Sequence, residues 1–400
     1  MNIHEYQAKQ IISKYGVKIP KGKVAYTPLE AKKVSKEVSA RGPWVLKAQI
    51  QSGARPLGRF IEKSAGKGSG VRLINTRREL FKQAGEMLGA TLVTPQTGPK
   101  GKLVTRVYVE SYHKVEHKFY VGFSIDRVNA TVMLLLANIG EKSIVSIINV
   151  EPDKIIRIPL DINKGASMKQ IRQASEFLQL PEKIHKNFKR YIQSLFKAFM
   201  ETDALMLEVN PTGVNKRGNF IALDAKMTID DRAMYRQPQI PPLFDATEIS
   251  ERVLHAAKDG FQYMAFKGSI GCIVNGDGLA LAVMDLIRSK GEDTACYLNV
   301  KGGVDRDKIA SGIKLIMTNP RVEGILINVL GGFLRCNLVA DGIIAAASEV
   351  GLNVPLVVRF EGTNKDEARQ ILENSHLPVI IASDMEDSVD KLLQAMEESD

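Results

Sequence analysis

Cysteine is scarce in this chain: its 400 residues include three, and no two of them form a CxxC pair. Cys272, Cys296 and Cys336 each stand alone in an apolar stretch, with no histidine beside them in the sequence. A disulfide framework and a zinc ribbon both need closely spaced groups of such ligands. We therefore expect three buried free thiols rather than a metal or redox centre.

Long hydrophobic runs are also lacking. No stretch reaches the roughly 18 apolar residues that a membrane-spanning helix needs, and the opening segment MNIHEYQAKQ has no apolar signal-peptide core. With 44% hydrophobic residues, however, the chain can bury the cores of two or three domains. We expect a soluble protein with no membrane partner, in the cytoplasm or in an organelle matrix.

Acidic residues are rare in the first hundred positions, where 6 Asp and Glu stand against 19 Lys and Arg, in a chain of net charge +10. Such a surplus can be an ordinary solvated face, can attract nucleotide phosphates, or can bind nucleic acid. No helix-turn-helix, RNP or zinc-finger pattern accompanies it. We therefore expect no nucleic acid partner.

Mixed periodicities mark the first part of the chain. A helix is predicted over 5–15, period-two alternation over 105–112 predicts a strand, and 118–137 is predicted to form a β-hairpin that turns near Asn129. Three prolines in 236–244, a stretch without periodicity, then indicate a linker. The pattern predicts one domain over 1–240 and a second over 245–400.

Beyond the linker, short uninterrupted apolar segments alternate with amphipathic helical patterns, which predicts a parallel, doubly wound sheet. These segments cover 269–275, 295–300, 324–330 and 354–360. Glycines follow three of them, and helix N-termini at such turns bind anions, although glycine also serves simply to turn the chain. Three such turns at the carboxyl ends of one sheet predict a ligand crevice.

A possible metal site lies in the first region. Period-two alternation in LMLEVNP places Glu208 and Asn210 on one face of a strand, and the returning strand places Asp224 opposite Asn210. Carboxylate and amide oxygens are the hard ligands that suit Mg²⁺ carrying phosphates. A solvated hairpin with chance acids is the alternative, but the apolar neighbours of both carboxylates favour a covered metal site.

Nine segments follow one another along the chain in a recognisable order: MNIHEYQAKQ, WVLKAQI, LVTPQTGP, EVNP, ALDAKM, IGCIVNGDGLA, GGFLRCN, ADGIIAA and VVRFEGTN. Together they resemble the β subunits of succinyl-CoA synthetase, also called succinate–CoA ligase. The resemblance implies an ATP-grasp domain, then a flavodoxin-like CoA-ligase domain, with Mg²⁺ and ATP/ADP as cofactors. It also implies an α subunit partner, in a heterodimer or an α2β2 tetramer, and a place in the tricarboxylic acid cycle. In that family succinate and CoA are joined while ATP becomes ADP and phosphate, through a phosphohistidine on the α subunit.

The same resemblance assigns roles to individual residues. Nucleotide binding falls to Lys47, Gly53, Ala54, Arg55, Glu110 and His113, and Mg²⁺ binding to Asn210 and Asp224. Glu208 matches a catalytic acid that orients the phosphohistidine. Substrate and phosphate contacts fall to Asn275, Gly332, Phe333 and Leu334. A lysine within an apolar strand, as Lys47 is, is costly unless it meets an anion such as phosphate. The chain has no histidine of its own in a glycine turn, so the phosphate carrier must come from the α subunit.

Several positions depart from the family pattern. The glycine-rich nucleotide loop is longer, so either Gly53–Arg55 or Gly66–Gly70 takes its role. Lys118 replaces an acid that contacts the nucleotide, which predicts weaker ATP binding because lysine accepts no hydrogen bond. Residues 138–142 read NIGEK instead of the usual glycine loop. In the second domain Asp277 replaces an alanine, Asn299 an aspartate and Lys301 a glycine.

An aspartate beside a bound phosphate would repel it by about 4 kcal/mol per charge at 4 Å and an effective dielectric constant near 20. Either Asp277 and Lys301 form a compensating pair, or phosphate no longer visits this crevice. Three functions therefore stay open: an ADP-forming succinate–CoA ligase β subunit, a related dicarboxylate (malate)–CoA ligase subunit, and a non-catalytic subunit that keeps the fold and the contact with the α subunit.

Overall fold

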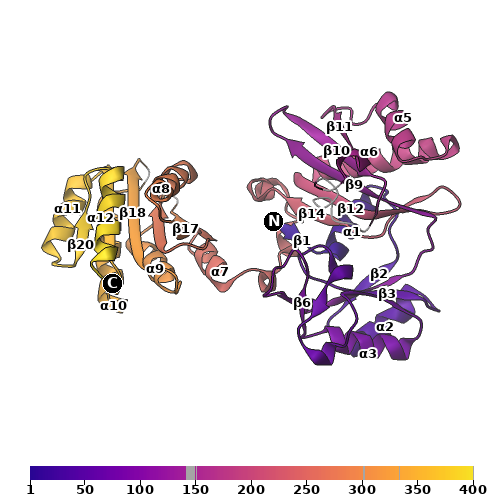
Figure 1. The fold of residues 1–400 in the computed structure, drawn as a ribbon, viewed down its shortest axis with the longest axis horizontal. Helices are drawn as coiled ribbons and strands as arrows, with labels where there is room; N and C mark the ends of the chain where they lie inside the picture. The colour runs from indigo at the N-terminus through magenta and orange to yellow at the C-terminus, as the bar shows by residue number, and fades with distance from the viewer. Residues whose placement is uncertain (141–148, 150, 301, 333, 400) are drawn as a thin grey trace. The chain divides into compact units, whose positions relative to one another are not determined.

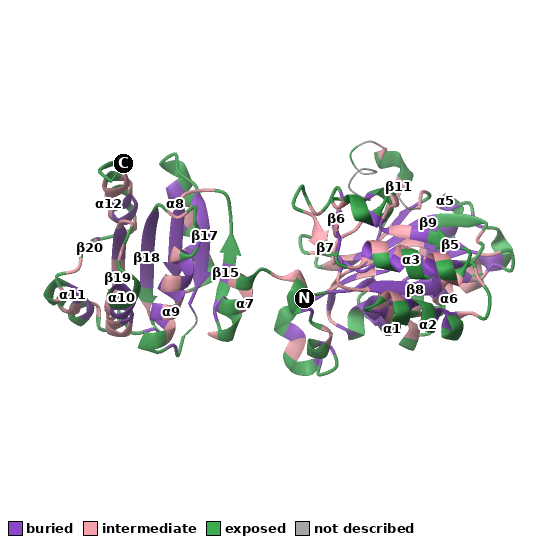
Figure 2. Cartoon of the chain, turned by 90° about the horizontal axis from the view of Figure 1, so that it is seen from below, coloured by how far each residue is buried: buried purple, intermediate pink, exposed green. Residues whose placement is uncertain are grey.

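The computed structural model describes residues 1–140, 149, 151–300, 302–332 and 334–399. The chain forms two compact units, Met1–Glu248 and Ile249–Asp400 (Figure 1). Within the described ranges, no helix combines the length and the apolar character needed to cross a membrane. Each unit has its own buried core, seen as purple strands and helix faces in Figure 2.

A seven-stranded antiparallel sheet, with the order β1-β14-β12-β9-β10-β11 and β13 paired to β12, forms the larger half of the first unit. Its strands are β1 (Asn2–Ile3), β9 (His117–Asp126), β10 (Thr131–Ala137), β11 (Ile155–Leu160), β12 (Ala204–Val214), β13 (Phe220–Ala222) and β14 (Lys226–Ile229). The helices that pack on it are α1 (Glu5–Lys14), α5 (Met168–Phe177) and α6 (His185–Glu201). The predicted hairpin is confirmed as β9 and β10, and the predicted N-terminal helix as α1.

A four-stranded sheet of order β2-β8-β3-β5 forms the other half of this unit. It contains β2 (Gly22–Ala25), β3 (Trp44–Ala48), β5 (Val71–Ile74) and β8 (Val107–Ser111), and α2 (Pro28–Val38) and α3 (Arg77–Met87) lie together against it (Figure 1). Thr27 and Thr76 start these two helices, because each hydroxyl accepts a hydrogen bond from the backbone N–H three residues later. A small third sheet holds β4 (Arg59–Phe60), β6 (Thr91–Val93) and β7 (Lys102–Leu103).

The second unit is a six-stranded sheet of order β15-β17-β16-β18-β19-β20, parallel except for β15 at its edge. Its strands are β15 (Gln262–Ala265), β16 (Ile270–Val274), β17 (Thr294–Asn299), β18 (Gly324–Gly331), β19 (Leu356–Gly362) and β20 (Val379–Ile381). The core on one face includes α7 (Glu251–Lys258), α9 (Arg306–Met317), α10 (Cys336–Val350) and α11 (Lys365–Asn374), and the core on the other includes α8 (Asp277–Ser289) and α12 (Met385–Glu397). From β17 to β20 this is the flavodoxin-like strand order, so the predicted fold class is confirmed.

The proline-rich segment 236–244 packs on the first unit instead of hanging free. Ile240 is 1% exposed and belongs to the core of the large sheet. Asp245, just beyond it, is buried against His4, with 2.6 Å between its Oδ2 and the imidazole Nε2. The first compact unit consequently continues to Glu248. All three cysteines are free and buried, as predicted.

Candidate active site

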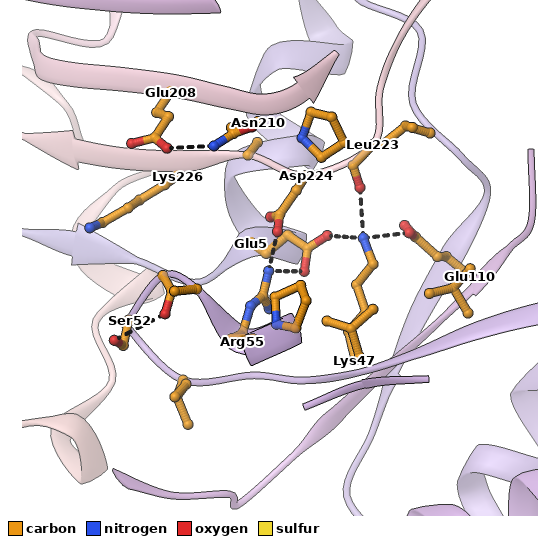
Figure 3. A pocket seen from close by; sticks show the side chains of 18 of the residues that line it. Glu5, Lys47, Ser52, Arg55, Glu110, Glu208, Asn210, Leu223, Asp224 and Lys226 are labelled. Carbon is orange, nitrogen blue, oxygen red and sulfur yellow. Dashed lines mark hydrogen bonds and ion pairs between the residues drawn. The ribbon is translucent and has the colours of Figure 1, made fainter. Parts of the chain in front are cut away.

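A pocket of about 330 Å³ is lined by side chains from both main sheets of the first unit (Figure 3). The predicted nucleotide, metal and catalytic residues all line it: Lys47, Gly53, Ala54, Arg55, Glu110, His113, Glu208, Asn210 and Asp224. Lys118 lines it too, whereas no residue of Gly66–Gly70 does. Of the two candidate glycine loops, Gly53–Arg55 is therefore the one at the pocket.

Lys47 lies near the end of β3 with a side chain only 6% exposed. Its ammonium is 2.8 Å from Glu5 Oε1 and 2.6 Å from Glu110 Oε1, and it donates to the Leu223 carbonyl at 2.6 Å. Two carboxylates thus compensate the cost of burying this cation.

Helix α1 supplies two charged groups that sequence reasoning missed: Glu5, which lines the pocket, and Lys9, which is buried behind it. Lys9 is fully buried, and its ammonium is 2.6 Å from Glu110 Oε2 and 2.8 Å from Glu5 Oε1. Burial alone would raise the pKa of the Glu5 carboxyl, but Lys47, Lys9 and Arg55 hold that pKa well below its usual range. The i,i+4 spacing of Glu5 and Lys9, on the helix face that carries apolar Ala8 and Ile12, was the available signal.

Arg55 completes the set of charges. It is 4% exposed, and its Nη2 lies 2.6 Å from Asp224 Oδ2 and 2.7 Å from Glu5 Oε2. Its Nη1 donates to the Ala48 carbonyl at 2.9 Å. The three cations and three carboxylates of this network therefore neutralise one another: Lys9, Lys47 and Arg55 with Glu5, Glu110 and Asp224.

The predicted metal ligands come from β12, which carries Asn210, and from the bend between β13 and β14, which carries Asp224. The register of β12 against β13 and β14 places Asn210 opposite Asp224, and Glu208 lies one step along the same face (Figure 3). An amide oxygen and a carboxylate, facing a pocket, are donors that fit a hard divalent cation. Burial raises the pKa of the Glu208 carboxyl, against the charge of Lys226. Lys226 also lines the pocket, and sequence reasoning gave it no role.

In the second unit, Asn275 and the turn that contains Gly332 lie where the strand order reverses between β16 and β18. Asn275 Nδ2 donates to the Leu330 carbonyl at 2.6 Å, and Asn275 Oδ1 accepts from the Leu330 N–H at 2.7 Å. This pair brings Asn275 beside the turn that contains Gly332. Leu334 is 2% exposed and belongs to the core, which leaves only its backbone for a ligand. Phe333 lies outside the described residues.

Asp277 is the first residue of α8, and its carboxylate has a partner. Asp277 Oδ1 accepts from Asn299 Nδ2 at 2.7 Å, and Asn299 Oδ1 accepts from the Gly276 N–H at 2.8 Å. Two of the departures from the family pattern therefore contact each other. Lys301, the partner predicted for Asp277, lies outside the described residues, so that pair stays a prediction.

Comparison with known proteins agrees with this architecture. A family model for the ATP-grasp domain matches residues 2–214, and one for CoA-ligase matches residues 273–393. The chain is thus an ATP-grasp protein with a CoA-ligase domain. It is 44% identical over 400 residues to the succinate–CoA ligase [ADP-forming] subunit beta of Rhodospirillum rubrum, covering 100% of both chains. It is 43% identical to the Paracoccus denitrificans protein of that name, covering 99% of this chain and 100% of the relative. The chain belongs to the succinate–CoA ligase β-subunit family.

Among solved structures, ATP citrate lyase from Methanothrix soehngenii in complex with citrate and coenzyme A has a TM-score of 0.71. The match covers 98% of this chain and 99% of that one at 17% sequence identity. At this identity the likeness concerns the fold alone.

Proposed function

We propose that this chain is the β subunit of an ADP-forming succinate–CoA ligase, with residues 1–240 as its ATP-grasp domain and 245–400 as its CoA-ligase domain. One observation carries the proposal: in a chain aligned over its full length with ADP-forming β subunits, every residue expected to hold nucleotide or metal lines one pocket. ATP or ADP binds in this pocket, and succinate, CoA and phosphate are the remaining substrates. The enzyme works in the cytoplasm or an organelle matrix, together with an α subunit in a heterodimer or α2β2 tetramer.

The roles follow from the charges in the pocket. Lys47 and Arg55 face the phosphates, while Glu110, His113 and the Gly53–Ala54 backbone hold the rest of the nucleotide. Asn210 and Asp224 hold Mg²⁺, which when bound offsets phosphate charge. Glu208 orients the histidine of the α subunit as it accepts the phosphoryl group. In the second domain the Asn275 side chain and the backbone of Gly332, Phe333 and Leu334 receive the substrate carboxylate and phosphate.

Labelling of the partner tests this proposal. The chain is co-purified with its α subunit and incubated with Mg²⁺ and ATP labelled in the γ-phosphate. We expect acid-labile label on the α subunit, and no ligase activity from the chain alone. Full ligase activity from the isolated chain, or a complex that stays unlabelled, would contradict the proposal.

A related dicarboxylate such as malate is the second candidate substrate, because the Asp277–Asn299 contact changes the polar groups at the substrate crevice. Comparison of kcat/KM for succinate and malate with the same complex decides between them. The third possibility, a non-catalytic subunit, predicts that the complex binds no ATP. The paired charges at the pocket instead support a catalytic subunit.

A further inference from the structure

Asp224, the proposed metal ligand, is already paired with a cationic side chain, that of Arg55. The Arg55 guanidinium is 2.6 Å from Asp224 Oδ2 and also bonds Glu5 Oε2, so it lies between the two carboxylates (Figure 3). A divalent ion on the same carboxylate would sit within a few ångströms of a guanidinium, and two cations at such a distance repel strongly in a poorly solvated pocket. Arg55 and the metal therefore compete for Asp224.

The backbone at Arg55 is held in place while its side chain does the pairing. The Arg55 carbonyl accepts hydrogen bonds from the N–H groups of Gly58 and Gly70, both at 3.1 Å, where the long loop leaves and returns. Replacement of Arg55 by a metal ion at Asp224 thus requires only a change of the Arg55 side-chain rotamer, without unfolding of the loop. The pocket beside it is where the phosphates of a nucleotide are proposed to lie, and a guanidinium matches phosphate oxygens as well as it matches a carboxylate.

We propose that Arg55 is the resident counter-ion of Asp224, and that a metal–nucleotide complex displaces it from this carboxylate onto the phosphate oxygens. The proposal rests on the function assigned above. Its consequence is a coupling between the two ligands: the metal frees Arg55 from Asp224, and the nucleotide gives the freed guanidinium a new partner. Metal alone binds weakly, because Arg55 then gives up its contact with Asp224 and gains no phosphate oxygen in its place. Removal of Arg55 strengthens the binding of metal alone and weakens the binding of nucleotide.

The test measures binding of Mn²⁺ without nucleotide, by electron paramagnetic resonance, to the full-length complex. We expect Arg55→Gln to bind Mn²⁺ at least about tenfold more tightly than wild type, since loss of one charge-assisted competitor is worth that much. ATP affinity of the same variant, measured by calorimetry, falls about tenfold or more. Adding Asp224→Asn removes the gain in Mn²⁺ affinity. Arg59→Gln, an exposed arginine four positions along, is the matched control and leaves Mn²⁺ affinity unchanged.

Unchanged or weaker Mn²⁺ binding by Arg55→Gln overturns the exchange. If that variant does not fold, Arg55→Lys serves instead: its shorter side chain predicts an intermediate gain, and no gain overturns the proposal equally. Failure of the wild-type complex to bind Mn²⁺–ATP at all overturns the nucleotide site itself and the exchange with it. If the wild-type complex binds Mn²⁺–ATP normally but Arg55→Gln has the wild-type affinity for Mn²⁺, only the exchange is overturned.

Discussion

At the scale of single residues, the charges in the pocket of the first unit are matched before any ligand arrives. Lys9 shows how much depends on this, because it is fully buried and contacts two carboxylates, Glu5 and Glu110. Those carboxylates raise its pKa, against the effect of burial, and so keep it charged. A buried charge that loses its partner costs far more than the pair contributes.

Lys9→Met keeps the length of the side chain but removes its charge, and we expect it to lower the free energy of unfolding by about 3–5 kcal/mol. Urea denaturation of the full chain measures this. Lys14→Met, on the exposed side of the same helix, should change stability by no more than about 0.5 kcal/mol. A loss in Lys9→Met no larger than in this control would contradict the proposed coupling of charges.

Sequence could identify some members of this network and not others. Lys47 was identified because a lysine inside an apolar strand demands an anion. Lys9 and Glu110 lie 101 positions apart, so no local pattern joins them. Arg55 was assigned to the nucleotide, but its bond to Asp224, 169 positions away, follows only from the tertiary fold.

At the scale of elements, the first residue of α8 is an aspartate, Asp277. A carboxylate in the first turn of a helix is favourable, and Asn299 bridges Asp277 and the N–H of Gly276. The Asp277 carboxylate and the Gly276 N–H thus already have partners within the chain. The contact between the Asp277 carboxylate and the Asn299 amide therefore explains locally how an aspartate is accommodated in this glycine turn.

Asn299→Asp should destabilise the second unit, because it places a second carboxylate against Asp277 in a buried position. The double variant Asp277→Ala with Asn299→Asp should recover most of the loss, since the like charges no longer meet. We expect a coupling of about 1–3 kcal/mol in a double-mutant cycle of unfolding free energies. Additive effects would mean that the two side chains do not interact.

The contact between His4, at the start of α1, and Asp245 makes the stability of the fold depend on pH. His4 is 1% exposed and pairs with Asp245, beside Arg106 and Glu248. Burial lowers the pKa of His4 and Arg106 adds to this, although Asp245 raises it. The unfolded chain therefore takes up the proton at higher pH than the folded one. The resulting stability is complete above about pH 6.5 and is lost as the pH falls below it.

His4→Gln should therefore flatten the fall in thermal unfolding temperature between about pH 7.5 and pH 5, compared with wild type. His255→Gln, on the exposed face of α7, should leave the slope as it is. Parallel slopes for His4→Gln and wild type would contradict the depressed pKa.

Most elements were predictable because their patterns are local. The strands of the second unit are continuous apolar runs with glycines at the ends of several, and the β9–β10 hairpin is two strand-like segments on either side of a turn near Asn129. The proline-rich segment 236–244 was predicted to be a linker, because prolines break regular structure whether or not the chain is packed. Only the tertiary contacts reveal that Ile240 is buried. The choice between Gly53–Arg55 and Gly66–Gly70 likewise needed the structure, since both segments are rich in small residues.

At the scale of the whole molecule, the proposed nucleotide pocket lies in the first unit and the proposed substrate contacts lie in the second. The described residues place no histidine in a glycine turn at either site, so we propose that a group from the α subunit carries the phosphoryl between them. On this proposal the chain cannot complete the reaction without the α subunit. It also makes phosphorylation of that partner the direct readout of the nucleotide pocket.

Phosphohistidine formation by the Asp224→Asn complex is the measurement closest to the central claim. A carboxylate on Mg²⁺ neutralises charge that an amide does not, so we expect metal-dependent labelling of the α subunit from ATP to be abolished, with the circular dichroism spectrum of the complex unchanged. Labelling by this variant with the wild-type rate and the wild-type dependence on Mg²⁺ would contradict the assignment of this pocket.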